Sequence, residues 1–310
     1  MLSELIGNHA VKSRITALLA AGRLPHALLI EGQRGTGRFT LACAVARALV
    51  CSTGNACGIC RNCIQAAHLT HPDILVYAPK EAVFKVNTVR QINADAMIKP
   101  NQASRKVMIL RDCEKMNDEA QNAFLKTLEE PPGTVQFILL TQNSKMLLDT
   151  IRSRCVIFTL VPPGFDEGLQ YLCDRGFEKD AATAALQQGE GNIGRAIARL
   201  EGTENPLGID ICGLLQKAAA DKTMEILQVF TPLEKDKGKI MLLFEQLTQY
   251  TAQAIREVAL QGRTACGYTM AGLLALQQAL SEAEAGLQQN GNKPLLLTIL
   301  CEKMICAARL

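Results

Sequence analysis

Four cysteines fall within a short segment with the spacing C-x5-C-x2-C-x2-C, and glycines lie between them. Cys51, Cys57, Cys60 and Cys63 offer four soft thiolates, a donor set that suits a tetrahedral Zn2+ site with no position left for a substrate. The spacing therefore predicts a structural zinc ion. Four unpaired thiols or two redox pairs are the alternatives, and the overlapping C-x2-C steps favour the metal.

A glycine-rich segment begins at Gly32, after an apolar run and before a helical pattern. Strand, glycine-rich turn and helix form the context of a P-loop, G-x-x-x-x-G-K-[ST], whose backbone amides surround phosphate oxygens. Gly32 and Gly37 fit this pattern. Arg38, however, stands where the lysine belongs, and Phe39 where the Mg2+-binding hydroxyl belongs. Phenylalanine cannot coordinate a hard cation.

We interpret this segment as a degenerate P-loop, made of Gly32, Gly35, Gly37 and Arg38. A glycine-rich turn that never bound phosphate is the alternative. ATP and Mg2+ are not expected to bind productively. Weak binding of a phosphate or sulfate ion by Gly35, Gly37 and Arg38 remains open.

A second departure follows the apolar strand expected over residues 106–110. In P-loop ATPases an acidic pair stands at this point, of which one Asp holds Mg2+ and the next carboxylate polarises water. Here Arg111 takes the first position and Asp112 the second. An arginine repels a divalent cation, so this position independently argues against catalysis.

The composition sets wider limits on the function. A chain of 310 residues with 48% hydrophobic content can form two or three domains. A net charge of +3 is too small to indicate nucleic-acid binding alone, and 4% aromatic residues argue against a base-stacking surface. We find no signal peptide and no apolar run of membrane-spanning length, so no membrane partner is expected. Twelve cysteines without a secretory signal favour a reducing cytoplasm.

The periodicity of apolar residues predicts three parts. Strands alternate with helices over residues 1–162, which predicts a parallel sheet covered by helices, with the four-cysteine module at 51–63. Three helices are expected over 163–205, and only helices over 206–310. The expected strands are 26–30, 74–77, 106–110, 136–141 and 156–158, with an extended piece at 84–87 and a helix capped by Thr88. Breaks in the C-terminal helices are expected near Pro232, Gly262–Gly267 and Asn290–Pro294.

Several strings carry a family likeness. Residues 1–205 resemble the AAA+ core and lid of the clamp-loader subunits of bacterial DNA polymerase III. The shared features are Gly7-x-His9, the P-loop region, the four-cysteine insert, Asn122-Ala-Phe-Leu-Lys-Thr-Leu-Glu-Glu-Pro-Pro132 and Ile151-Arg-Ser-Arg-Cys155. The resemblance implies an α/β fold: an AAA+ P-loop parallel-sheet core with a zinc insert, a three-helix lid and an all-α C-terminal collar.

Two kinds of subunit in this family carry the four cysteines and the Ser-Arg-Cys string. One is the gamma/tau motor, an ATPase, and the other is the stationary delta-prime kind, which does not hydrolyse ATP. The lid arginine of the motor falls in a Gly-x-x-Arg pattern, and here that place holds Gly194, one residue before Arg195. Together with Phe39 and Arg111, this favours the delta-prime kind.

The resemblance also implies a role in trans for Arg154, the arginine of the Ser-Arg-Cys string. In this family that arginine reaches the ATP site of a neighbouring subunit. The implied partners are the gamma/tau motor and delta subunits and, through the assembly, the sliding clamp and primer-template DNA. Two alternatives are kept: an active gamma/tau-type motor, and a zinc-containing adaptor outside the clamp loader.

Overall fold

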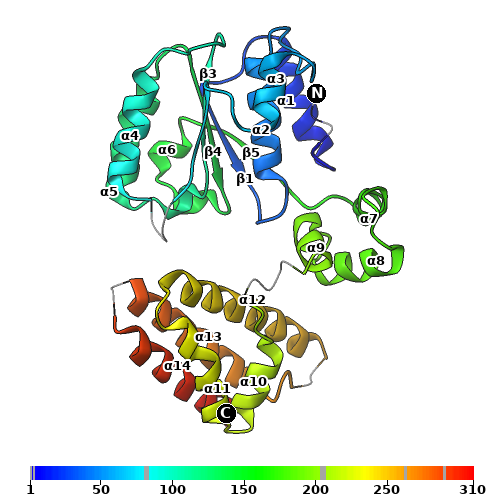
Figure 1. Ribbon diagram of the computed structural model, residues 1–310, viewed down its shortest axis with the longest axis vertical. Helices are drawn as coiled ribbons and strands as arrows, with labels where there is room; N and C mark the ends of the chain where they lie inside the picture. Colours follow the sequence, from blue (N-terminus) through cyan, green and yellow to red (C-terminus); the bar gives the residue numbers. More distant parts are fainter. Residues whose placement is uncertain (1, 3, 80–83, 203–206, 262–263, 289–290) are drawn as a thin grey trace. The chain divides into compact units, whose positions relative to one another are not determined.

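The computed structural model describes residues 2, 4–79, 84–202, 207–261, 264–288 and 291–310. The chain forms two compact units, Met1–Glu204 and Asn205–Leu310 (Figure 1). The boundary expected at residue 205 lies outside the described residues. Within the described part, no helix combines the length and the apolar character needed to cross a membrane.

The first unit is built on one parallel sheet. Its five strands are β1 (Ala27–Glu31), β2 (Ile74–Tyr77), β3 (Lys106–Leu110), β4 (Val135–Thr141) and β5 (Val156–Thr159). They are ordered β2-β3-β4-β1-β5, and every neighbouring pair is parallel. Leu29 of β1 is in register with Leu139 of β4 and Ile157 of β5. Strands β1, β3 and β4 are almost wholly apolar because helices cover both faces of the sheet.

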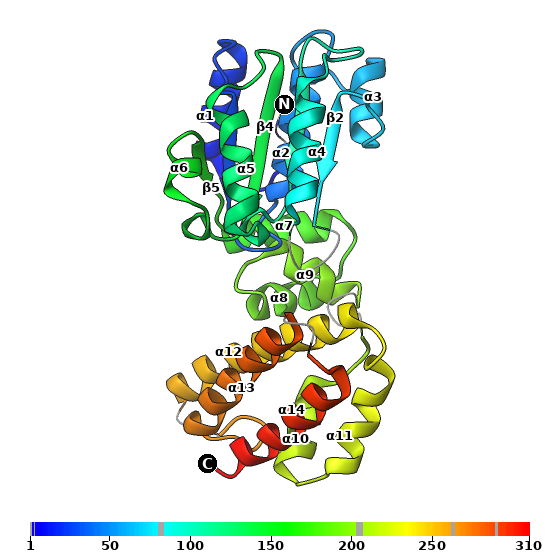
Figure 2. The ribbon, with the colours of Figure 1, turned by 90° about the vertical axis from the view of Figure 1, so that its left-hand side faces the viewer.

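Helices pack on both faces of this sheet (Figures 1 and 2). One face carries α1 (His9–Ala20), α2 (Arg38–Val50) and α3 (Arg61–Ala67), and the other carries α4 (Val86–Met97), α5 (Asp118–Glu129) and α6 (Asp149–Arg152). Successive β1 side chains alternate between the two cores: Leu28 and Ile30 pack with α2, and Leu29 packs with α5.

Three further helices complete the first unit after β5. They are α7 (Phe165–Asp174), α8 (Lys179–Gln188) and α9 (Ile193–Leu200). Leu172, Ala182, Leu186 and Ala196 form their small shared core. The apolar stripe of each helix is thus buried against the other two, and polar residues face outward.

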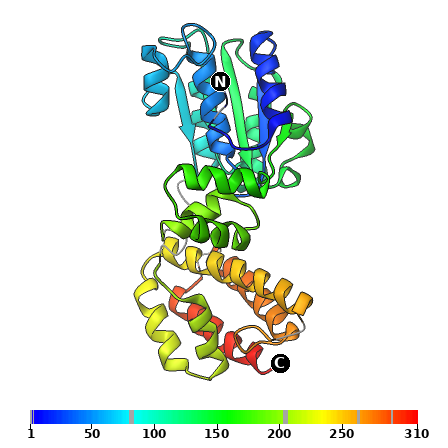
Figure 3. The ribbon, with the colours of Figure 1, turned by 90° about the vertical axis from the view of Figure 1, so that its right-hand side faces the viewer.

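The described residues of the second unit contain helices and no strand longer than an isolated bridge (Figure 3). The helices are α10 (Ile211–Ala219), α11 (Thr223–Phe230), α12 (Lys237–Gln261), α13 (Met270–Gln288) and α14 (Lys293–Ala308). Their core is rich in leucine and contains the buried rings of Phe230, Phe244 and Tyr268. A short 3-10 helix, η3 (Thr231–Leu233), joins α11 to α12, and two others, η1 (Cys113–Lys115) and η2 (Ser144–Met146), lie in the first unit.

The structure confirms the predicted fold class, an α/β core with a parallel sheet followed by helices. Local details differ. The extended piece expected at 84–87 is wrong, because Phe84 makes only an isolated bridge with Met116 and α4 begins at Val86. Thr88 lies inside the first turn of α4 and does not cap it. The C-terminal unit also has a break after Ala219 that the sequence pattern did not reveal.

Candidate functional site

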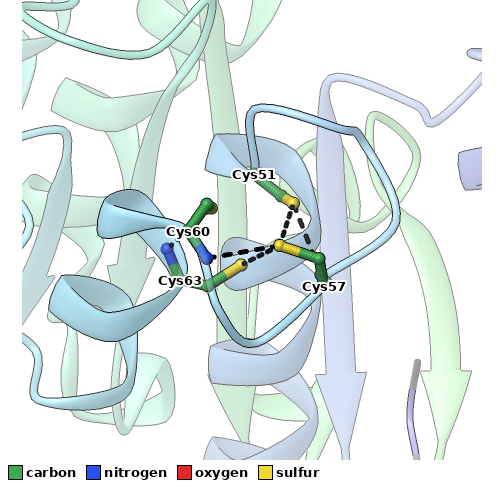
Figure 4. Close-up of side chains that lie close together, drawn as sticks. All are labelled: Cys51, Cys57, Cys60 and Cys63. Carbon is green, nitrogen blue, oxygen red and sulfur yellow. Dashed lines mark hydrogen bonds between the residues drawn. The ribbon is translucent and has the colours of Figure 1, made fainter.

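The four cysteines of the predicted metal site lie together between α2 and α3 (Figure 4). All four sulfurs are within 4.8 Å of one another. The Sγ atoms of Cys51 and Cys57 are 3.7 Å apart, and those of Cys57 and Cys63 are 4.0 Å apart. Four sulfurs at about 2.3 Å from one tetrahedral ion are about 3.8 Å from each other. The cluster therefore has the size and donor set of a four-thiolate metal site.

Backbone amides already point at these sulfurs. The N–H groups of Cys57, Cys60 and Cys63 each donate to the preceding cysteine sulfur of the cluster, at 3.4 Å. Cys60 also caps α3, because its sulfur accepts from the first turn of that helix. The Asn62 side chain donates to the Val50 carbonyl and ties α3 to the end of α2 at 2.7 Å. The loop is thus folded around the cluster by its own backbone.

The thiols of the cluster differ in acidity. Burial raises the pKa of Cys51, but hydrogen bonds from Thr53 and from the Cys57 amide outweigh it and lower the pKa to about 5. Burial, reinforced by the neighbouring sulfurs of Cys51 and Cys60, raises the pKa of Cys63 to about 12. Four adjacent thiolates repel one another, so only a bound cation can hold all four deprotonated.

The degenerate P-loop connects β1 to α2, as the sequence predicted. Gly35 and Gly37 both have a φ of +90°, which a side chain would strain. The Thr36 hydroxyl donates to the Gln33 carbonyl at 2.8 Å, so the hydroxyl is used inside the loop. Strand, turn and helix follow one another as in a phosphate-binding loop.

Phe39 and Arg111, which stand where the P-loop pattern expects the Mg2+ ligands, contact each other. The guanidinium carbon of Arg111 lies 4.7 Å from the ring centroid of Phe39, within the range of a cation–π interaction. Phe39 also packs against the core between α2 and the sheet. A side-chain cation and an aromatic ring thus lie together beside the glycine-rich loop. Neither side chain can coordinate a metal ion.

Arg38 brings a second positive charge to the same place. Burial lowers the pKa of its guanidinium, and the carboxylates of Glu114 and Asp112 oppose that shift. The Nη1 atom of Arg38 and the Oε1 atom of Glu114 are buried without a hydrogen-bond partner. Glu114 also accepts from the Gln142 amide at 3.3 Å. The acidic groups after β3 are therefore balanced by arginines.

The first turn of α9 is fastened to the loop. The buried Asn192 side chain donates to the Arg34 carbonyl at 2.8 Å, and the Gly194 amide donates to the Gly35 carbonyl at 3.1 Å. A Cβ atom on Gly194 would collide with the Cα of Gly35, and one on Gly35 with Asn192. Glycine is thus required at 194 for the backbones to approach this closely.

Arg154 follows α6 and is partly exposed. Its guanidinium donates to Glu129 at the end of α5, at 2.7 Å, and to the Thr150 carbonyl, at 2.9 Å. The side chains of Arg154 and Glu129 are 35% and 49% exposed. An ion pair this open to water contributes only about 0–1 kcal/mol. Arg154 is therefore held in place without being committed to Glu129.

Comparison with known proteins identifies the family. The family described as "DNA polymerase III, delta subunit" matches residues 7–164, just over half of the chain. The chain belongs to this family. The matched range of this DNA polymerase III subunit family contains the P-loop, the cysteine cluster, Arg111 and Arg154.

Individual relatives include more than one kind of subunit. The chain is 35% identical to DNA polymerase III subunit delta' of Escherichia coli over 61% of this chain. That match spans only 58% of the E. coli protein. This chain is also 28% identical to DNA polymerase III subunit gamma of a Buchnera aphidicola strain, over 79% of this chain and 70% of that protein.

A solved structure shares the fold. The gamma subunit-related protein of Thermotoga maritima superposes with a TM-score of 0.51 at 18% identity, covering 95% of this chain and 99% of that one. At this identity the likeness concerns the fold alone. It agrees with the α/β core followed by helices.

Sequence reasoning located the cysteines, the loop and Arg154 but missed their neighbours. The contact between Phe39 and Arg111 joins residues 72 positions apart, and no local pattern marks it. No pattern marked Asn192, which caps α9 and holds the loop. The pairing of Arg154 with Glu129 of α5 had no signal in the sequence either.

The contact between Gly194 and Gly35 leads to a testable prediction. Gly194→Ala should destabilise the first unit by about 1–3 kcal/mol, because the new methyl group has no space beside the loop backbone. Urea unfolding would measure the loss, and hydrogen exchange should show faster exchange of loop amides. Gly133→Ala is the control, since a Cβ there meets nothing within 4 Å. Equal stability of the two variants would contradict the close packing.

Proposed function

We propose that this chain is the stationary, delta-prime-type subunit of a DNA polymerase III clamp loader. In this proposal it does not hydrolyse ATP, and it supplies Arg154 to the ATP site of a neighbouring motor subunit. The single observation that carries the proposal is the stack of Arg111 on Phe39, at the two positions where the loop hydroxyl and the strand-end carboxylate would bind Mg2+. The implied partners are the gamma/tau and delta subunits, and through them a sliding clamp and primed DNA.

The alternative is an active motor, because subunits named gamma and tau are also among the relatives. The geometry speaks against this alternative at three separate segments. The loop lacks its hydroxyl, the strand end carries an arginine, and the lid position of the motor arginine is a glycine packed on Gly35. Any one of these residues alone could be neutral sequence variation. The three together favour a chain that does not need to bind Mg-ATP.

The role of Arg154 follows from its exposure and chemistry. Arginine presents a planar fork of donors that matches phosphate oxygens, and an arginine finger supplied in trans raises phosphoryl-transfer rates about 10^3–10^5-fold. Exchanging the exposed pair with Glu129 for a neighbour's phosphate costs little. The Thr150 carbonyl keeps the guanidinium near the turn during that exchange.

We further propose that the cysteine cluster binds one structural Zn2+ ion. Four thiolates leave no ligand position open, so the ion supplies folding energy and no chemistry at a substrate. The loop between α2 and α3 is too short to form a hydrophobic core of its own. The bound metal would stabilise its fold instead.

Zinc binding can be tested by substituting one ligand. The purified chain should contain about one Zn2+ per molecule by elemental analysis. Cys60→Ser should lose the metal and exchange amide hydrogens faster over residues 51–63, because serine can still cap α3 but cannot replace the thiolate. Cys306→Ser, at an exposed thiol in the second unit, is the control. A metal-free wild-type chain with four freely reactive thiols would contradict the proposal.

The isolated chain should neither hydrolyse ATP nor bind it with Mg2+. Phe39 and Arg111 leave the cation without an anchor, and the first turn of α9 lies on the loop. Calorimetric titration with Mg-ATP and a phosphate-release assay measure both properties. A second titration with ATP in the absence of Mg2+ distinguishes weak anion binding by Gly35, Gly37 and Arg38 from Mg2+-dependent nucleotide binding. Mg2+-dependent binding at one site per chain, with turnover, would support the motor alternative.

Loss of the Arg154 side chain should lower the ATPase activity of the clamp-loader complex and leave the isolated chain unchanged. Arg154→Ala should leave the stability of the chain within about 1 kcal/mol of wild type, because the side chain is exposed and weakly paired. Clamp-stimulated ATPase of the reconstituted complex on primed DNA should fall. Arg154→Lys should restore little of this ATPase activity, since the lysine ammonium lacks the planar fork of donors of a guanidinium.

Arg152→Ala is the matched control for this experiment. Arg152 ends α6, two residues earlier, and pairs with Asp149 at 3.0 Å, so its removal also deletes an exposed arginine from the same segment. Its variant should retain wild-type ATPase. If Arg154→Ala assembles normally and retains full ATPase and loading, Arg154 is not a finger and the chain acts as scaffold alone.

A further inference from the structure

Two cysteines of the second unit meet far from the metal cluster in sequence. Cys212 lies in the first turn of α10, and Cys266 lies between α12 and α13. Their sulfurs are 2.7 Å apart, closer than two non-bonded sulfurs normally approach and longer than the disulfide bond of about 2.05 Å. The Tyr250 hydroxyl of α12 lies 2.9 Å from the Cys266 sulfur.

The backbone at Cys266 adopts a conformation that side chains rarely take. Cys266 and Gly267 have φ values of +49° and +88°. Ala265 and Tyr268 exchange two backbone hydrogen bonds across them, at 3.1 and 2.9 Å. This is a tight turn with positive φ at both central residues, a place that glycine, asparagine or aspartate normally fills. A cysteine at this position therefore carries backbone strain.

Both sides of the turn are anchored, so the sulfur is held where it is. The Tyr268 side chain is fully buried, and its hydroxyl donates to the Met304 carbonyl of α14 at 2.9 Å. Gly267 lies against Ala219 of α10, where an added Cβ would be 2.8 Å from the Ala219 methyl. The turn is thus fixed to α10 and α14 together. This packing holds the backbone of Cys266 beside α10, which brings its side chain within reach of Cys212.

The pair can be reached from solvent. A shallow hollow of about 470 Å3 is lined by Gln216, Ala219, Ala220, Cys266 and Gly267. Both cysteines are half-buried rather than enclosed. Burial and the adjacent Cys212 raise the pKa of the Cys266 thiol to about 11, so this thiol is protonated near neutral pH.

We propose that Cys212 and Cys266 are a redox-sensitive pair that a small-molecule disulfide, such as oxidised glutathione, converts into an intramolecular disulfide. One protein thiolate attacks the glutathione disulfide and releases a glutathione thiolate. The second protein thiolate then attacks the mixed disulfide and releases the other glutathione. The protein loses two electrons and two protons, and the oxidant gains both. This inference does not depend on the proposed function.

The bond would join α10 to the turn before α13 across 54 residues of sequence. Closing a loop of this length restricts the unfolded chain, so oxidation should stabilise the second unit. Neither sulfur belongs to the cluster that could hold a metal ion among the described residues. Two thiols and a phenol are also too few soft ligands for a closed metal site.

The experiment titrates the full chain with oxidised glutathione in a Cys306→Ser background, which removes an exposed thiol able to link two molecules. Free thiols are alkylated, and trypsin digestion is followed by mass spectrometry. The linked peptides should be residues 200–217 and 264–303. The second also carries Cys301, because trypsin does not cleave before Pro294, so fragmentation must assign the link to Cys266.

We expect this link to form first among the cysteines outside the metal cluster and to raise the melting temperature by about 5 °C. Cys212→Ser and Cys266→Ser should each abolish both the link and the temperature shift. The melting temperature of each reduced variant shows whether it is folded. Free thiols at both positions under oxidation, or separate glutathione adducts without a link, would overturn the proposal.

Discussion

Parallel pairing within one sheet is the constraint on which the first unit depends. Because β1, β4 and β3 run in the same direction side by side, their carboxyl ends lie at one edge of the sheet. That edge receives the glycine-rich loop after β1, Arg111 after β3 and Gln142 after β4. Residues distant in sequence thereby form one neighbourhood, onto which the first turn of α9 also packs.

Arginines lie beside the carboxylates at this edge of the sheet. A P-loop ATPase places carboxylates here for Mg2+, and removing the metal would leave them facing each other. In this chain Arg38 and Arg111 bring permanent positive charges beside Asp112 and Glu114. The ring of Phe39 gives the Arg111 guanidinium a surface to rest on. The substitutions are therefore interdependent, since reversing one alone would leave a charge or a ring without its partner.

Sequence patterns predicted what depends on local periodicity and short spacing. The apolar runs predicted the strands, and the three helices over 163–205 appear as α7, α8 and α9. The cysteine spacing predicted a cluster whose sulfurs do converge. Contacts between distant positions had no such signal. The approach of Cys212 to Cys266 depends on how α10 packs beside the turn at Gly267, and the pairing of Arg154 with Glu129 on how α5 ends beside α6.

The surroundings of Arg154 differ from those of Arg38 and Arg111 in a way that fits separate roles. Arg38 is half-buried beside carboxylates, and the exposed guanidinium of Arg111 rests on an aromatic ring, so both have partners within the chain. Arg154 instead has one exposed carboxylate and one carbonyl as partners, and water competes for both. Contacts this weak leave the Arg154 guanidinium available for a phosphate on another subunit, as the proposed function requires.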